Sequence, residues 1–402
     1  MTSPRSILLL GSTGTIGVNT LDVVQRHPDR FSVHGLVAAK NTQRLFQQAL
    51  DHRPKVLVIC DENALNHWQQ QGLTDQLSAQ LGYRPQVGGQ GILEELCASP
   101  DVDTVVAAIV GAAGLRPTLA ALKAGKRVLL ANKESLVLAG RFMIQAAQAS
   151  GAILLPVDSE HNAIFQCLPA DFDVRKASSY GIERLVLTAS GGPFRSKSLE
   201  DIQRVTPAQA VAHPNWVMGP KISVDSATMA NKGLELIEAL WMFGLPPSQL
   251  SVLIHPQSIV HSLVEYKDGS MLAQLGCPDM RTPIAHVLGL PDRIASGSAR
   301  LNLAKIAKLD FEEPDLRRFP MLGLAFDVLN KADSAAPVFN AANEVSVERF
   351  LKGMIQYPDI VRITERCLER FGVANIQNLD DALNLDAEVR LHAHSLIYSS
   401  VV

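Results

Sequence analysis

The chain has 402 residues, and at about 150 residues per domain this length predicts two to three domains. Hydrophobic residues make up 47% and charged residues 19%, which is typical of a folded chain, and the net charge of −3 argues against a nucleic-acid partner. The five scattered cysteines form no CxxC pair, so we expect buried thiols in a cytoplasmic protein and neither disulfides nor a zinc site.

The N-terminal segment MTSPRSILLLGSTG holds an apolar run of only four residues before Gly11. This run is too short for the apolar region of a signal peptide, and no long apolar stretch follows it elsewhere. We therefore expect no signal peptide, no membrane span and no membrane partner.

Short apolar runs alternate with polar helical stretches over the first 155 residues. The runs that predict strands are SILLL, FSVHGLVA, VLVIC, TVVAAIV, RVLLA and AILLPV. Helices are expected between them, for example over 17–26 and 42–51. Continuous apolar strands that alternate with helices indicate a parallel sheet covered on both faces. We predict an α/β, Rossmann-like domain over 1–155.

The pattern changes after residue 155. Residues 156–290 hold four successive strand patterns and one strong helix at about 227–243, which predicts a central α+β domain with a more antiparallel sheet. Residues 291–319 are expected to be a linker. The helical patterns of 320–402 predict a C-terminal helical bundle, in which the polar NAANEVSV at 340–347 suggests an internal contact but no chemistry.

Three glycines follow the first predicted strand. Gly11, Gly14 and Gly17 form GxxGxxG at a strand–helix junction, a variant of the Rossmann fingerprint. Such glycines let the backbone turn tightly and approach a pyrophosphate at the helix N-terminus. The alternative is a tight connection without a ligand.

The end of the second predicted strand bears on which nicotinamide cofactor binds. An NAD site usually has an acid there for the ribose 2′-hydroxyl, whereas this chain has Lys40, Asn41 and, a little later, Arg44. A cationic tip suits a 2′-phosphate, so we predict NADPH rather than NADH. The alternative is that these are ordinary solvated charges.

A second polar group, Asn132, Lys133 and Glu134, follows the predicted strand RVLLA. In open parallel sheets ligands bind beyond the carboxyl ends of the strands, so this position favours a site. A surface ion pair is the alternative.

The segment LLPVDSEHNAIF places Asp158, Ser159, Glu160 and His161 together. If the strand continues through residue 160, side chains alternate and both carboxylates point to one side. Two close carboxylates repel each other unless a cation lies between them, and Mg²⁺ or Mn²⁺ accepts oxygen ligands of this kind. The alternative is a solvated turn.

The segment HPNWVMGPKISVDSATMANKGLELIEAL, at 213–240, has two parts. The first, with its prolines and large apolar side chains, predicts either a mobile lid near 212–222 or a buried hairpin. The second predicts a helix on which Asn231, Glu235 and Glu238 share a face, with Lys232 three residues before Glu235.

Residues near the start of this helix suit an anion. Ser226, Asn231 and Lys232 supply donors of the kind that bind phosphate, and Glu235 could complete a three-carboxylate metal site. Ser190, with the two glycines after it, forms a small polar loop that could also hold a phosphate. A solvated helix face and a plain turn are the alternatives.

Eight segments in chain order resemble the motif series of the 1-deoxy-D-xylulose 5-phosphate reductoisomerase family. They are GSTGTIG, LLANKESLV, LLPVDSEHNAIFQCL, LTASGGPFR, HPNWVMGPKISVDSATMANKGLELIEA, HPQSIVHSLVEYKDGS with QLGCPDMRTPI, and NAANEV. The resemblance runs from residue 11 to about 344. It implies a homodimer that isomerises 1-deoxy-D-xylulose 5-phosphate and reduces it with NADPH to 2-C-methyl-D-erythritol 4-phosphate, in the non-mevalonate isoprenoid route.

The resemblance also implies residue roles. The divalent metal, Mg²⁺ or Mn²⁺ with Co²⁺ as a third candidate, would be held by Asp158, Glu160 and Glu235. The hydroxy-ketone end of the substrate would contact Lys133 and Ser159, with Lys133 also counted as catalytic. The phosphate would contact Ser190, Ser226, Asn231 and Lys232, and the lid would carry His213, Trp216 and Met218. The cofactor contacts would be Thr13, Gly14, Thr15, Ile16, Lys40, Asn41, Asn132, Glu134 and Gly219.

Two other classes of protein stay open on sequence alone. A semialdehyde dehydrogenase would need a nucleophilic cysteine, for which Cys167 in the apolar AIFQCL is the best candidate. A non-catalytic NADPH-sensing protein would have the cofactor fold without the acidic set at 158, 160 and 235.

Overall fold

The computed structural model describes residues 3–212, 219–331 and 333–399, which form two compact units. The first unit consists of Met1–Ser135, Met143–Asn162 and Asp279–Ala299, and the second of Leu136–Phe142, Ala163–Pro278 and Arg300–Val402. The predicted division into 1–155, 156–290, 291–319 and 320–402 stays a prediction.

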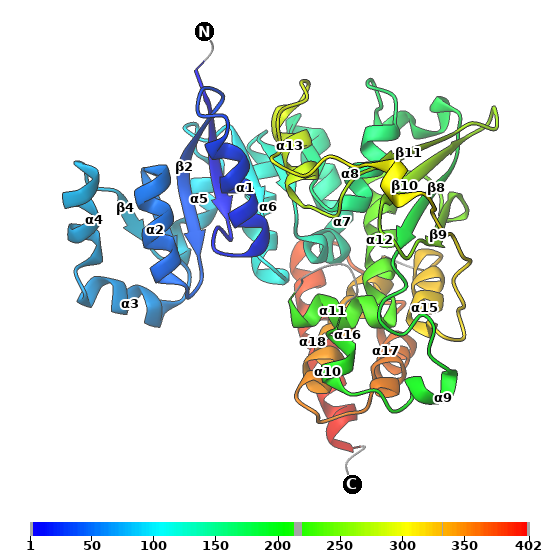
Figure 1. The fold of residues 1–402 in the computed structure, drawn as a ribbon. Helices are drawn as coiled ribbons and strands as arrows, with labels where there is room; N and C mark the ends of the chain where they lie inside the picture. Colours follow the sequence, from blue (N-terminus) through cyan, green and yellow to red (C-terminus); the bar gives the residue numbers. More distant parts are fainter. Residues whose placement is uncertain (1–2, 213–218, 332, 400–402) are drawn as a thin grey trace. The chain divides into compact units, whose positions relative to one another are not determined.

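The first unit is built on a seven-stranded parallel sheet with the strand order β4-β3-β2-β1-β5-β6-β7 (Figure 1, blue to cyan). Its Val-, Ile- and Leu-rich strands are almost wholly buried, as expected for a parallel sheet with both faces covered. The α/β prediction is confirmed. The strands are β1 (Arg5–Leu10), β2 (Phe31–Ala38), β3 (Val56–Ile59), β4 (Gln86–Gly88), β5 (Thr104–Ala107), β6 (Arg127–Leu130) and β7 (Ile153–Pro156).

All six strands predicted for this part of the chain are present, and β4 is an addition. It has three residues, QVG, and contains no apolar run that a sequence pattern could detect. It pairs with β3 at the edge of the sheet.

Helices connect these strands, as the alternating pattern predicted. The expected helices over 17–26 and 42–51 correspond to α1 and α2. The connecting helices are α1 (Thr15–Gln25), α2 (Thr42–His52), α3 (Glu62–Gln70), α4 (Leu73–Leu81), α5 (Leu93–Ala98), α6 (Leu115–Lys123) and α7 (Lys133–Ser150), and α8 (Ser159–Cys167) follows the last strand.

One helix joins the first unit from a distant part of the sequence. The helix α13 (Arg281–Gly289) ends in carbonyls that accept hydrogen bonds from Arg5, Arg30 and Arg127, one to each of residues 287–289. Guanidinium groups at a helix C-terminus stabilise its negative dipole end. These three contacts explain why this helix belongs with the parallel sheet.

The second unit contains a four-stranded sheet with the order β11-β10-β8-β9 (Figure 1, green to yellow). The pairs β8–β10 and β10–β11 are antiparallel and β8–β9 is parallel, which agrees with the predicted more antiparallel sheet. The strands are β8 (Ile182–Ala189), β9 (Leu250–Ile254), β10 (Val260–Tyr266) and β11 (Met271–Leu275).

The helix predicted at about 227–243 is α12 (Ala230–Phe243), and it is preceded by α11 (Pro220–Thr228). The two helices meet at Met229, which takes a left-handed conformation with φ of 63°. This conformation is strained for a residue with a side chain, so the surrounding packing must hold the turn.

The C-terminal part of the second unit is helical, as predicted (Figure 1, orange to red). Its helices are α15 (Pro320–Leu329), α16 (Ala335–Leu351), α17 (Tyr357–Phe371) and α18 (Leu379–Ser399), and the short helices of the unit are α9 (Leu199–Ile202), α10 (Pro207–Ala210) and α14 (Leu303–Ile306). Within the described part of the chain, none of the helices combines the length and the apolar character that crossing a membrane requires.

Candidate functional site

The glycine triplet lies between β1 and α1, as the fingerprint predicts. Gly11 has φ of 80°, and a Cβ there would lie 2.5 Å from the carbonyl oxygen of Ala108. Gly17 lies in the first turns of α1, where a Cβ would come within 2.5 Å of the Gly11 carbonyl oxygen and closer still to that of Ser12. Gly14 caps α1, and a Cβ there would make only an ordinary contact, 3.5 Å from the Gly11 carbonyl oxygen. The first and third glycines thus allow close packing, and the second leaves room at the helix N-terminus.

The end of β2 carries the predicted cationic tip, but with an acid nearby. The Lys40 ammonium lies 3.6 Å from Asp61, which follows β3 and caps α3. Asn41 caps α2, and the Arg44 guanidinium donates to the Thr13 carbonyl at 3.1 Å. Asp61 was missed because it lies 21 residues beyond Lys40. The signal that could have found it is its position directly after a strand that is adjacent to β2.

Lys133 and Asp158 meet at one edge of the parallel sheet. Lys133 begins α7 after β6, Asp158 follows β7, and these two strands pair in parallel. The Lys133 ammonium lies 2.7 Å from the Asp158 carboxylate, and their side chains are only 9% and 17% exposed. Asn132 caps α7 and donates to the Gly111 carbonyl at 2.9 Å, so it holds this edge in place.

The extended-strand geometry predicted for residues 153–160 is wrong. β7 ends at Pro156, and α8 begins at Ser159 because the Asp158 carbonyl accepts from the Asn162 amide at 2.9 Å. Asp158 therefore acts as a helix cap, a role that Asp favours. A carboxylate oxygen of Asp158 nevertheless lies within 4.8 Å of one of Glu160, so the two groups converge by a different route.

The electrostatics of Asp158 favour its charged form. Burial would raise the pKa of this carboxyl, but the Lys133 ammonium and then His161 lower it, so the pKa lies well below its usual range. His161 is fully buried, with its Nδ1 3.8 Å from Asp158. The Ser159 hydroxyl donates to the Glu160 carboxylate at 2.6 Å. This edge thus presents two carboxylates, each held by a neighbouring side chain.

In the second unit, α12 brings three predicted residues together on one face, as their spacing indicated. The Asn231 amide donates to one oxygen of Glu235, and the Lys232 ammonium pairs with the other. Lys232 and Glu235 are 3% and 1% exposed, and Glu238 is also buried. A buried carboxylate needs such partners, since an unpaired charge in the interior is costly.

The loop with Ser190 packs against the end of α11. Gly191 and Gly192 have φ of 79° and 64°, and a Cβ on Gly192 would lie 2.7 Å from the Ser226 carbonyl oxygen. The Gly192 amide donates to the Ser190 hydroxyl at 3.1 Å. The loop therefore lies beside Ser226 because its glycines leave space for that contact.

The remaining predictions for the site have mixed outcomes. His213, Trp216 and Met218 lie outside the described residues. Gly219 belongs to the second unit and caps α11. Cys167, the nucleophile of the dehydrogenase alternative, is a buried cysteine outside any disulfide at the end of α8.

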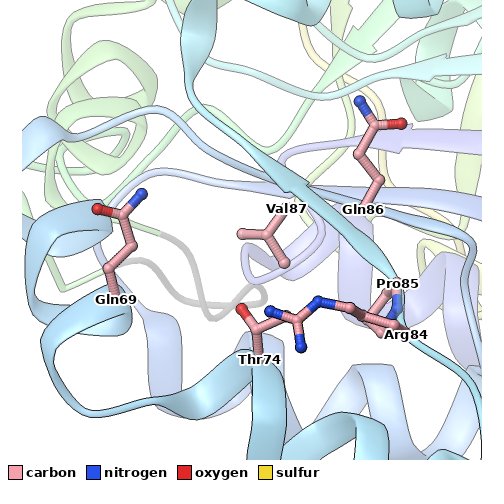
Figure 2. A pocket seen from close by; sticks show the side chains of 6 residues that line it. All are labelled: Gln69, Thr74, Arg84, Pro85, Gln86 and Val87. Carbon is pink, nitrogen blue, oxygen red and sulfur yellow. The ribbon is translucent and has the colours of Figure 1, made fainter.

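A surface hollow of about 420 Å³ lies elsewhere in the first unit (Figure 2). It is lined by Gln69, Thr74, Arg84, Pro85, Gln86 and Val87, none of which is a predicted site residue. The exposed guanidinium of Arg84 pairs with Asp75, which weakens its attraction for an anionic ligand.

Models of one protein family match most of the chain. The model described as 1-deoxy-D-xylulose 5-phosphate reductoisomerase matches residues 7–140, and the two models of its C-terminal domains match 154–243 and 275–392.

Relatives with the same name match along almost the whole length. The enzyme named 1-deoxy-D-xylulose 5-phosphate reductoisomerase from Pseudomonas fluorescens is 53% identical over 98% of both chains. The one from Laribacter hongkongensis is also 53% identical, over 96% of this chain and 98% of its own.

Two solved structures of such enzymes have a similar fold. A DOX-P reductoisomerase in complex with NADPH, fosmidomycin and magnesium is 46% identical, with a TM-score of 0.91 over 98% of both chains. The enzyme from Zymomonas mobilis in complex with NADPH is 44% identical, with a TM-score of 0.89 over 99% of both chains.

Proposed function

The chain belongs to the 1-deoxy-D-xylulose 5-phosphate reductoisomerase family, and from this premise we propose which of its residues bind the metal, the substrate and the cofactor. It is an NADP-dependent oxidoreductase that isomerises 1-deoxy-D-xylulose 5-phosphate and reduces it to 2-C-methyl-D-erythritol 4-phosphate, in the non-mevalonate route to isoprenoid precursors. Its cofactors are NADPH and magnesium.

One observation supports the residue assignments most strongly. Each carboxylate of the proposed metal set is bonded to a residue of the proposed substrate set: Asp158 to Lys133, Glu160 to Ser159, and Glu235 to Lys232 and Asn231. Metal ligands and substrate-binding groups are therefore direct neighbours within each unit. If the metal and these side chains bind the same substrate, the metal ligands and the substrate-binding residues must lie next to each other.

We assign the divalent metal to Asp158, Glu160 and Glu235. Carboxylate oxygens are the ligands that Mg²⁺ prefers, and the closeness of the first two groups fits this chemistry. When bound, the metal supplies Lewis-acid stabilisation of the negative charge that develops on the substrate oxygens. Mn²⁺ and Co²⁺ are the proposed alternatives to Mg²⁺.

The substrate is then held at its two ends. The hydroxy-ketone end would contact Ser159 and Lys133, which is paired with Asp158 at the sheet edge. The phosphate would be contacted by Ser190, Ser226, Asn231 and Lys232. We also propose His213 and Trp216, from the predicted lid, as substrate-binding residues. Because the phosphate is remote from the reacting carbons, its binding energy can position them.

We propose that the cofactor binds the first unit at the carboxyl ends of its parallel strands. The N-terminus of α1 favours the pyrophosphate, through the backbone of Thr13, Gly14, Thr15 and Ile16. Lys40 and Asn41 would contact the 2′-phosphate end, and Asn132, Glu134 and Gly219 would complete the contacts. The nicotinamide supplies the hydride, and the chain binds and orients it.

The dehydrogenase and sensor alternatives are not favoured. Cys167 is buried, whereas a catalytic cysteine must be reached by its substrate. The acidic set argues against a protein that only senses NADPH.

The experiment that tests the function measures NADPH oxidation with 1-deoxy-D-xylulose 5-phosphate and Mg²⁺, before and after EDTA. We expect oxidation that requires the substrate and that EDTA stops, with recovery when Mg²⁺ is returned in excess. Oxidation that continues at full rate in EDTA would contradict a metal requirement.

Lys232→Ala tests the phosphate assignment. Because a hydrogen bond from a charged group contributes about 1.5–3 kcal/mol, the KM for the substrate should rise about 10- to 100-fold, with a smaller change for NADPH. The control is Lys308→Ala, which removes an exposed lysine paired with Asp310, and thermal unfolding is measured on both variants because Lys232 is buried. An unchanged substrate KM in Lys232→Ala would count against the phosphate role.

We also propose a homodimer. β11 is an edge strand of the four-stranded sheet, and it exposes Met271, Leu272 and Leu275 by 51%, 49% and 37%. An exposed apolar edge strand is a natural template for pairing with a second copy. Sedimentation should give the mass of two chains, and Leu272→Glu should shift it towards one. A monomer at all concentrations would contradict the proposal.

The cytoplasmic location stays a prediction.

A further inference from the structure

The motif NAANEVSV of α16 has an unexpected partner in the structure. Asn343 is fully buried, and its amide donates to a carboxylate oxygen of Asp225 at 2.8 Å. Asp225 is itself only 1% exposed, and its other oxygen pairs with the Lys221 ammonium at 2.8 Å. The contact joins α16 to α11 over 118 residues of sequence.

A second contact reaches the same stretch of α11 from the next helix. The Tyr357 hydroxyl, at the start of α17, donates to the Ala227 carbonyl at 2.8 Å in a buried position. Burial raises the pKa of this phenol, so it stays protonated and remains a donor. Its ring also packs edge-on against Phe194, with centroids 5.4 Å apart.

These two contacts flank Ser226. The residues on either side of it, Asp225 and Ala227, are buried and each is held by one C-terminal helix, whereas Ser226 is only half-buried. Ser226 also lies against Gly192, and Phe194 belongs to the same loop as Ser190. The C-terminal helices thus contact both segments of the proposed phosphate site.

Local structure alone cannot hold Ser226 in place. α11 has nine residues and ends at the left-handed Met229. A helix of this length is marginal by itself, and donors to a ligand must be held to within about 0.5 Å. External contacts must therefore fix this turn.

We propose that Asn343 and Tyr357 are positioning residues, which hold Ser226 and the Ser190 loop in the geometry that binds the substrate phosphate. The inference rests on the proposed phosphate site and extends it. It gives the C-terminal helices a part in substrate affinity, through backbone and side chains that do not touch the substrate.

The test uses Tyr357→Phe, which removes one hydroxyl and leaves the ring packing. We expect the KM for 1-deoxy-D-xylulose 5-phosphate to rise about three- to tenfold, the effect of one buried hydrogen bond, with the KM for NADPH unchanged. The inhibition constant of inorganic phosphate should rise by the same factor. Asn343→Ala should raise the KM further. If Asn343→Ala folds poorly, the result for Tyr357→Phe alone decides the test.

The control is Tyr180→Phe, which removes a more exposed hydroxyl that donates to the Asp171 carbonyl and accepts from the Asp173 amide, and it should leave both KM values unchanged. Combining Tyr357→Phe with Ser226→Ala separates positioning from general stability. If Tyr357 acts through Ser226, adding Tyr357→Phe to the Ser226→Ala variant should raise the substrate KM less than twofold.

The outcomes distinguish the two levels of the proposal. A normal KM in Ser226→Ala would overturn the phosphate site itself. A raised KM in Ser226→Ala with a normal KM in Tyr357→Phe would overturn the positioning role alone. Additive effects in the double variant would also overturn it.

Discussion

Glu235→Gln is expected to lower kcat about a thousandfold or more, while NADPH still binds with its normal affinity. Lewis-acid stabilisation contributes several kcal/mol, and each 1.36 kcal/mol corresponds to a factor of ten in rate. Glutamine keeps the size of the side chain but removes the negative charge that we propose binds the metal. Excess Mg²⁺ should restore a part of the activity, because the remaining ligands are intact.

A loss of stability must be separated from this loss of activity. Glu235 is 1% exposed and neutralises Lys232, and removing one partner of a buried pair destabilises by about 3–5 kcal/mol. Thermal unfolding and NADPH binding should therefore be measured together with kcat. The matched control is Asp386→Asn, a buried carboxylate that pairs with Arg390 in the same unit. Equal losses of turnover and NADPH binding in Glu235→Gln would contradict the metal assignment.

Gly17→Ala is expected to destabilise the first unit by about 1–3 kcal/mol or more, the range for overpacking a close contact. Alanine in a helix interior is normally favoured over glycine by about 1 kcal/mol. Here the added methyl group would meet the backbone oxygens of Gly11 and Ser12, which cannot move aside as a flexible side chain can. The steric term should win, and the melting temperature should fall.

Gly14→Ala should behave in the opposite way. Its conformation suits alanine and the nearest atom to a Cβ is 3.5 Å away, so the melting temperature should hardly change. NADPH affinity should fall at least tenfold, because the methyl group would occupy the space proposed for the pyrophosphate. Gly91→Ala, with open space around it, is the control for both. Normal NADPH binding in Gly14→Ala would contradict a pyrophosphate site at α1.

The chemistry-bearing residues were found from the sequence where neighbours in the chain are also neighbours in space. On α12, Asn231 and Lys232 contact Glu235 because residues three and four apart share a helix face. The glycine triplet lies at the β1–α1 turn because its conformational needs are local. Regular apolar runs likewise predicted the strands of both sheets except β4, which has no apolar run.

The extended strand through Glu160 was predicted wrongly, for a physical reason. Asp and Ser after an apolar run are compatible both with an extended chain and with a helix cap, and only packing selects between them. The sheet ends at Pro156, and the Asp158 carbonyl then accepts the first hydrogen bond of α8. The two carboxylates still converge, although by a geometry that alternation of side chains does not describe.

The sequence by itself determined the order of strands and helices, the α/β class and, through its motifs, the family. The tertiary structure alone decided the long-range contacts: Lys133 with Asp158, Asp61 beside Lys40, and Asn343 on Asp225. Hydrophobic periodicity and helix capping depend on only a few consecutive residues. They can therefore be recognised in short stretches of the sequence. Which distant segments pack together depends on the burial of the whole unit, and that balance cannot be read from any single stretch.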